Sequence, residues 1–208
     1  MYLIFKRFIA SNHLFWRYRH HFQKIEKSYG EVKVNNFNKI FKNYKIKSVL
    51  DFGCATGDKL VYFINRGVSI ICGIDINPKA IKAAEEKIKR HNVYYKFFNT
   101  IDQKKIKFFF KKKFDLTIID RVLYILNDKE LDNCIRKICK ISNYIYIDDF
   151  FLDEKKYNNL NIKNIRGYTH RDFDKILRKN KFKLIFKKKS PYKKVLFANP
   201  KQALFKRV

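Results

Sequence analysis

Short apolar runs alternate with amphipathic stretches over most of the chain. Runs of about four to eight apolar residues are typical of buried strands, whereas apolar residues at steps of three and four indicate helices. Because strands that alternate with helices form a parallel sheet with helices on its faces, the pattern predicts an α/β fold of the doubly wound, Rossmann-like class. The expected parallel strands cover residues 47–52, 69–75, 93–98, 114–120 and 144–148.

Capping residues mark where the expected helices begin and end. Asn77 followed by Pro78 is typical of a helix start, and Gly67 is typical of the position just after a helix end. We expect Asp128 to cap the helix between the fourth and fifth strands. We expect residues 169–172, Thr-His-Arg-Asp, to form a capping box for the last helix.

The last part of the chain predicts a hairpin. Residues 183–187 and 195–198 are apolar enough to form strands, and Pro191 lies in a turn between them. Together with the five parallel strands, this pair gives a mostly parallel, seven-stranded sheet with a terminal antiparallel hairpin.

The first 45 residues predict N-terminal helices rather than strands. Phe15, Tyr18, Phe22, Ile25 and Tyr29 recur at steps of three and four and form one apolar stripe. The stripe allows three interpretations: a helix packed on the main domain, a lid over an active site, or a basic amphipathic helix on a membrane surface. We therefore divide the chain into an N-terminal helical lid or cap, residues 1–45, and a main domain, residues 46–208.

The chain is strongly basic, with 48 Lys and Arg residues against 19 Asp and Glu residues and a net charge of +29. Such a charge favours an anionic partner such as a nucleic acid or a membrane surface. The alternative is the amino-acid bias of an AT-rich genome, since Lys, Asn, Ile, Phe and Tyr are all abundant. The distribution keeps both interpretations open: no acidic residue follows Asp174, and residues 1–50 hold only Glu26 and Glu31 as acids.

Composition disfavours several classes of protein. No apolar run approaches the roughly 18 residues of a membrane-spanning helix, and charged residues interrupt the apolar start of the chain. A cytoplasmic location is the default expectation, with peripheral membrane contact still open. The four cysteines match no zinc or disulfide spacing, so we expect reduced, mostly buried thiols and no bound metal.

The most informative segment is residues 49–57, Val-Leu-Asp-Phe-Gly-Cys-Ala-Thr-Gly. It places Asp51 near the end of a strand and small residues before a helix, which lets a ligand approach the backbone closely. Asp75 ends the next strand, where a carboxylate can accept hydrogen bonds from ribose hydroxyls. Because Asp51 would repel a pyrophosphate but attract an ammonium group, the charges favour S-adenosylmethionine over a dinucleotide.

These motifs resemble those of the class I (Rossmann-like) S-adenosylmethionine-dependent methyltransferases. The resemblance covers residues 47–150 and implies that S-adenosylmethionine is the cofactor. It implies that Asp75 contacts the ribose and that Ile76 lies against the adenine, whose amine Asn99 or Asp102 would contact. The cofactor-binding residues that it implies are Asp51, Gly53, Cys54, Ala55, Gly57, Asp75, Ile76, Asn99, Asp102 and Asp120.

The expected reaction is an in-line displacement at the methyl carbon, for which the protein mainly positions the acceptor and excludes water. A general base is needed only for a hydroxyl or a protonated amine. Asp120, Tyr124 and His170 are the candidate catalytic residues, although His170 also fits a surface position in the first turn of a helix. Asp148 and Asp149 are further candidates. With Asp120 they could hold a divalent cation, in a layout similar to that of catechol-type O-methyltransferases.

The sequence disfavours some acceptors. Residues 120–124 lack the Asp-Pro-Pro-Tyr and Pro-Cys sequences of enzymes that methylate base amines or cytosine carbon. We expect a small-molecule acceptor, including sugars and lipids. The alternatives are an RNA or protein acceptor that binds the basic N-terminal and C-terminal regions, and a non-catalytic S-adenosylmethionine-binding regulatory module. An NAD-linked oxidoreductase is disfavoured by the charge of Asp51, and the oligomeric state stays open.

Overall fold

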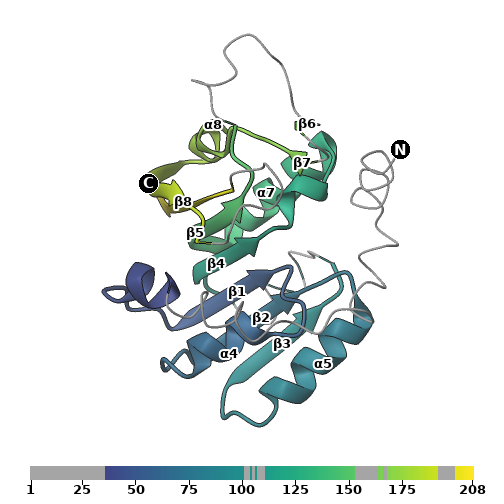
Figure 1. Ribbon diagram of the computed structural model, residues 1–208. Coiled ribbons are helices and arrows are strands. Elements are labelled where there is room, and N and C mark those ends of the chain that lie inside the picture. The colour runs from purple at the N-terminus through teal and green to yellow at the C-terminus, as the bar shows by residue number, and fades with distance from the viewer. Residues whose placement is uncertain are drawn as a thin grey trace.

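A computed structural model describes residues 36–100, 104, 106, 111–152, 164–165, 168–191 and 200–208. The expected apolar stripe of residues 15–29, the candidate Asp102 and the expected strand 195–198 lie outside the described residues. The described part contains a central sheet with helices on both faces (Figure 1).

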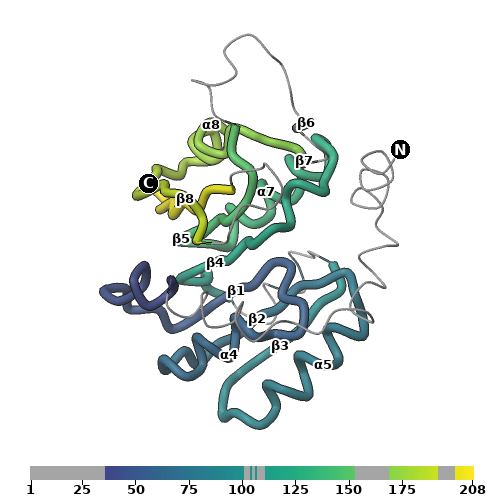
Figure 2. Tube along the Cα trace, in the orientation of Figure 1, coloured from purple at the N-terminus to yellow at the C-terminus, as the bar shows by residue number. Residues whose placement is uncertain are grey.

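Within this described part, one seven-stranded sheet has the strand order β3-β2-β1-β4-β5-β9-β8. The strands are β1 (Ser48–Phe52), β2 (Ile70–Ile74), β3 (Tyr94–Phe98), β4 (Phe114–Asp120), β5 (Ser142–Asp149), β8 (Phe182–Lys189) and β9 (Lys201–Arg207). The first five are parallel, whereas β9 pairs antiparallel with both β5 and β8. The chain runs outward from β1 to β3, returns across the sheet to β4 and continues to the far edge (Figure 2). The predicted fold class is confirmed.

Helices cover the two faces of the sheet because alternate strand residues are apolar on both sides. Residues 36–41, α4 (Asp58–Ile64) and α5 (Pro78–Ile88) pack on one face, and α7 (Asp128–Ile141) and α8 (Phe173–Lys179) on the other. Figure 1 shows α4 and α5 together on one side of the sheet, with α7 and α8 on the opposite side. In β1, Val49 packs into the hydrophobic core on the face covered by α4, and its neighbour Leu50 packs into a separate core on the other face.

Two of the predicted helix starts are wrong by one to three residues. The cap of α7 is Asn127, whose side chain accepts from Glu130 N, not Asp128, which is the first residue of the helix. The cap of α8 is Asp172, whose side chain accepts from Lys175 N. Thr169 is instead the last residue of β7 (Tyr168–Thr169), which pairs with β6 (Asn164–Ile165) in a small sheet that the sequence pattern did not predict.

The hairpin is antiparallel as predicted, but its second described strand is β9, which begins three residues after the expected strand ends. The four cysteines are buried and form no disulfide, as expected. Burial raises the pKa of the Cys134 and Cys139 thiols to about 12, so both stay protonated at neutral pH. No helix among the described residues is long and apolar enough to cross a membrane.

A buried hydrogen-bond network fastens residues 36–41 to the sheet. Asn36 Nδ2 donates to Gln202 Oε1 over 2.7 Å, and the Tyr146 hydroxyl donates to the same oxygen over 2.8 Å. Gln202 Nε2 donates back to Asn36 Oδ1 over 3.2 Å. The network joins the helical residues 36–41, β5 and β9, and all three side chains are buried.

Gln202→Leu should lower the free energy of unfolding by roughly 2–3 kcal/mol, because it leaves the buried Tyr146 hydroxyl without its acceptor and Asn36 Nδ2 with only its 3.4 Å bond to that hydroxyl. Urea unfolding followed by circular dichroism measures this change. Adding Tyr146→Phe should restore part of the loss, since it removes the hydroxyl that has lost its acceptor. Full stability of the single variant would contradict the structural role of this network.

Candidate active site

The carboxyl ends of the parallel strands bring four aspartates to one edge of the sheet. Asp51 and Asp120 lie near the ends of the adjacent strands β1 and β4, and Asp75 directly follows β2. Asp148 is paired with Asp120 in the register of β4 and β5. In doubly wound sheets this edge is where ligands bind, so it is the candidate active site.

A tight loop, residues 53–57, connects β1 to α4. The amides of Gly53 and Cys54 both donate to Ile74 O, over 2.7 and 3.0 Å, and Gly57 N donates to Cys54 O over 2.9 Å. The backbone has positive φ at Gly53, Ala55 and Gly57. The loop is therefore coiled against the end of β2, with its backbone close to the strand ends.

Gly53 cannot be replaced by a larger residue without a steric conflict. A Cβ atom there would lie 2.2 Å from Val122 Cγ2, and the φ of 81° disfavours any L side chain. The close approach brings the end of β1 against the segment that follows β4, so the two sides of the site are packed directly on each other.

Asp75 holds the loop to the start of α5. Its Oδ2 accepts from Ala55 N over 2.8 Å, and its Oδ1 accepts from Asn77 N over 2.9 Å. Asn77 in turn caps α5, as predicted, by accepting from two amides of its first turn. Ile76, beside Asp75, keeps 42% of its surface exposed, and Asn99 is exposed just after β3. These positions leave an apolar and an amide side chain accessible near Asp75.

A buried lysine that sequence reasoning missed lies between two of the aspartates. Lys59 Nζ is 3.4 Å from Asp51 Oδ2 and 3.9 Å from Asp120 Oδ2. The same ammonium group donates to Gly53 O over 3.3 Å. A signal was present in the sequence, because Lys59 lies four residues before the buried Phe63 and so falls on the buried face of α4.

The next group of charges surrounds Asp148. Arg121 Nε donates to Asp148 Oδ1 over 3.1 Å, and Ser190 Oγ donates to Asp148 Oδ2 over 2.8 Å. Burial and the charge of Asp120 raise the pKa of Asp148 to about 7, although Arg121 and Ser190 oppose the shift. Burial also raises the pKa of Asp149, to about 6. Arg121 itself has a φ of 58°, a strained conformation that is often found at functional sites.

Tyr124 and His170, two of the candidate catalytic residues, both pack against the ring of Phe150. The ring centroid of Phe150 is 5.3 Å from that of Tyr124 and 5.5 Å from that of His170. The Arg121 guanidinium lies 5.4 Å from the same centroid. The alternative surface position for His170 is wrong, because this side chain is only 6% exposed and precedes α8.

The short helix that carries Tyr124, η2 (Leu123–Ile125), is clamped from two directions. Asp149 Oδ2 accepts from Leu123 N over 2.8 Å. Arg171 donates to Leu123 O over 3.1 Å and to Leu126 O over 2.6 Å. These hydrogen bonds fix the position of Tyr124. Asp149 and Arg171 therefore have a structural role, since both hold the helix that carries Tyr124.

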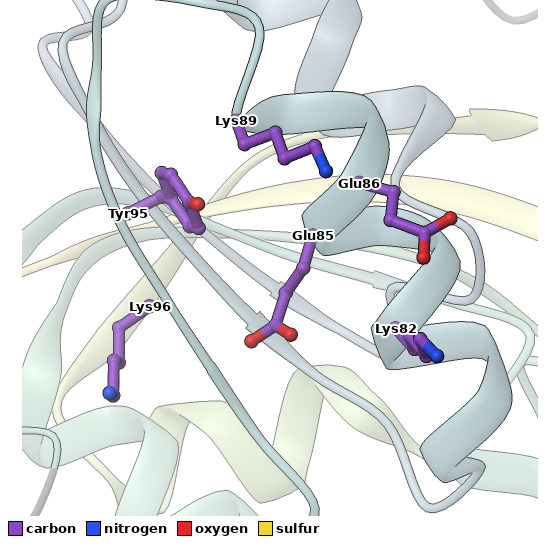
Figure 3. A pocket seen from close by; sticks show the side chains of 6 residues that line it. All are labelled: Lys82, Glu85, Glu86, Lys89, Tyr95 and Lys96. Carbon is purple, nitrogen blue, oxygen red and sulfur yellow. The ribbon is translucent and has the colours of Figure 1, made fainter.

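Metal binding gains no support from the arrangement of these acids. Among the described residues, no three His, Cys, Asp or Glu side chains are grouped closely enough to hold a metal ion. A pocket between α5 and β3 is lined by none of the strand-end aspartates; its lining residues are Lys82, Glu85, Glu86, Lys89, Tyr95 and Lys96 (Figure 3). The carboxyl edge of the sheet therefore remains the candidate site.

Residues 49–143 match the family model described as a methyltransferase domain. The chain is 34% identical over 90 residues to a tRNA (guanine-N(7)-)-methyltransferase of Prochlorococcus marinus. The matched stretch covers 40% of this chain and 43% of that protein. It is 28% identical over 126 residues to a ribosomal protein L11 methyltransferase of Dictyoglomus thermophilum, over 57% of this chain and 40% of that one. The matched stretches span from about a quarter to less than half of the length of the first curated relatives.

The fold is similar to that of a magnesium protoporphyrin IX methyltransferase from Synechocystis PCC 6803, crystallised with S-adenosylhomocysteine. That structure has a TM-score of 0.66 and 19% sequence identity and covers 97% of this chain and 98% of its own. The described part of the chain thus has the Rossmann-like α/β fold of that methyltransferase.

Gly53→Ala should destabilise the protein by about 1–3 kcal/mol more than Gly67→Ala, because only the first variant adds a clash to the cost of positive φ. Gly67 is the matched control, since its φ is 84° and a Cβ there meets nothing within 4 Å. Urea unfolding of the two variants measures the difference. Equal losses would show that Val122 moves aside freely.

Asp148 should make stability depend on pH. Because its folded pKa is raised above that of the unfolded chain, its protonation stabilises the folded state at low pH and this contribution is lost as the pH rises through about 7. The free energy of unfolding should therefore fall less between pH 5 and pH 8 for the Asp148→Asn variant than for the wild type. Urea unfolding at the two pH values tests this, and an unchanged difference would contradict the raised pKa.

Proposed function

We propose that this protein is an S-adenosylmethionine-dependent methyltransferase. The observation that carries the proposal is the coiled loop of residues 53–57, held by Asp75 at the carboxyl end of β2. Small residues and positive φ values leave the loop backbone open to close contact with a ligand. The cofactor supplies a methyl carbon attached to a positively charged sulfonium sulfur.

The residues near the loop fit the parts of this cofactor. Each carboxylate oxygen of Asp75 accepts one backbone amide and retains a further lone pair, which can accept from a ribose hydroxyl. The exposed Ile76 offers an apolar surface to the adenine ring, and Asn99 offers an amide to its amine. The same region would bind a bare nucleoside without any phosphate contact.

The charges favour a cationic ligand end over an anionic one. Asp51 and Asp120 together carry two negative charges, and Lys59 compensates one of them. The net charge left beside the loop would attract the ammonium of a methionyl group and would repel a pyrophosphate. This argument also disfavours an NAD-linked oxidoreductase.

The acceptor side would be formed by Tyr124, His170 and Arg121 around the Phe150 ring. In this arrangement His170 or Asp120 would take the proton of a hydroxyl acceptor, and Tyr124 would orient it. We propose a small molecule as the acceptor, including a sugar or a lipid. An anionic macromolecule is the second candidate, because the edge strand β8 is lined by exposed lysines.

Calorimetric titration with S-adenosylmethionine, S-adenosylhomocysteine and NAD tests the cofactor. We expect binding of the first two and none of NAD. Asp75→Asn should weaken both by roughly 10- to 100-fold, because it removes charge-assisted hydrogen bonds to the ribose.

The matched control is Asp115→Asn. Asp115 also accepts two backbone amides, those of Lys47 and Ser48, but at the opposite end of the sheet. This variant should bind the cofactor as the wild type does. An analogue of S-adenosylhomocysteine without ribose hydroxyls should bind weakly to the wild type. Asp75→Asn should leave the affinity for this analogue unchanged. Binding of NAD alone would overturn the proposed function.

A further inference from the structure

The edge of the sheet formed by β8 and β9 has an unusual charge. These two strands carry seven basic residues and no acidic residue. Lys183, Lys187, Lys188 and Lys189 are all exposed on the edge strand β8. Part of this charge is compensated: Asp174, on α8, is paired with Lys187, and Lys201 lies opposite Asp149 of β5. We propose that this edge binds the phosphate backbone of a single-stranded nucleic acid.

The register of the strands places like charges directly opposite each other. Lys183 pairs with Lys206, and Lys189 pairs with Lys201. Cross-strand pairs of like charge destabilise a sheet, so the fold by itself gains nothing from either pair. Because neighbouring residues of a strand point to opposite faces, Lys183 and Lys206 lie on the face that carries Tyr144, whereas Lys189 and Lys201 lie on the face that α8 covers. A phosphate bound at the first pair would neutralise it, which gives these two lysines a physical role.

Aromatic rings lie among the lysines. Lys206 Nζ is 5.7 Å from the ring centroid of Tyr144, and Lys188 Nζ is 5.5 Å from that of Phe186. Tyr144 and Phe186 are both partly exposed, and Tyr44 packs edge-on against Tyr144. Proteins that bind single strands combine a basic track for the backbone with aromatic rings for the bases. This surface has both features.

The four exposed lysines of β8, which we call the lysine track, follow this edge strand toward the candidate active site. From Lys183 to Lys189 the strand extends roughly 20 Å, at about 3.3 Å per residue. Lys201 is paired with Asp149 at the carboxyl end of β5, and Ser190, directly after Lys189, donates to Asp148. A strand bound along β8 would therefore reach the carboxyl edge of the sheet. That this delivers a methyl acceptor rests on the proposed function.

The opposite edge of the sheet argues against amino-acid bias as the whole origin of the charge. There, Lys82, Lys89 and Lys96 surround Glu85 and Glu86 in the pocket between α5 and β3 (Figure 3). The same lysine-rich chain thus has one edge where glutamates alternate with lysines and one edge whose strands, β8 and β9, carry no acid. This difference in arrangement favours a polyanion at β8.

The test is fluorescence anisotropy of labelled 12-mer RNA and DNA single strands with the full chain over a range of salt concentrations. The variant K183Q/K188Q/K189Q should bind at least tenfold more weakly, and the slope of log K against log salt should fall by about 2. The control K82Q/K89Q/K96Q also removes three exposed positive charges and should stay within about twofold of the wild type.

Three results would overturn the proposal. One is no binding by the wild type, a second is an equal loss in both triple variants, and the third is equally tight binding of polyglutamate, which has charge but no bases. Preference for RNA over DNA, or the reverse, supports the proposal and identifies the strand. Calorimetry with S-adenosylmethionine separates the two ideas: cofactor binding should be unchanged in K183Q/K188Q/K189Q, and its absence in the wild type contradicts only the proposed function.

Discussion

The candidate site depends on one buried electrostatic contact, the ammonium of Lys59 between the carboxylates of Asp51 and Asp120. All three side chains are nearly excluded from solvent. Breaking such a buried pair by removing one partner typically costs about 3–5 kcal/mol, because a charge is left without compensation in a poorly solvated place. Since Lys59 also binds Gly53 O, the contact joins β1, β4 and the loop that follows β1. The geometry of the strand ends is therefore coupled to their charge.

This contact overrides local preferences of the chain. Lys59 lies in the first turn of α4, where the helix dipole is positive and disfavours a cation. Ala55, in the same loop, has a φ of 46°, which glycine would adopt at lower cost. Local preferences that are violated beside a ligand-binding edge are expected at functional sites, where the stability of the whole fold compensates for them. The loop is thus shaped by its contacts with the strand ends rather than by its own propensity.

The sequence was sufficient for the sheet but not for its last strand. Buried parallel strands are apolar along their whole length, so β1, β2 and β4 stand out in the sequence. β9 carries a polar residue in its interior, Gln202, and is less apolar than the expected strand over residues 195–198. Its burial is stabilised by hydrogen bonds to Asn36 and Tyr146, which are 166 and 56 residues away. No local pattern contains such a long-range contact.

The same distinction separates the two halves of the site. The half that fits a nucleoside lies between Asp51 and Asn77, so its spacing along the chain predicts its chemistry, and the structure brings these residues together. The proposed acceptor half combines Tyr124, Phe150 and His170 with the Asp148–Ser190 contact, from segments that meet only in the fold. Loop-borne groups of this kind differ between enzymes that share one architecture. A sequence can therefore indicate the methyl donor while leaving the acceptor to be determined from surfaces such as the lysine track on β8.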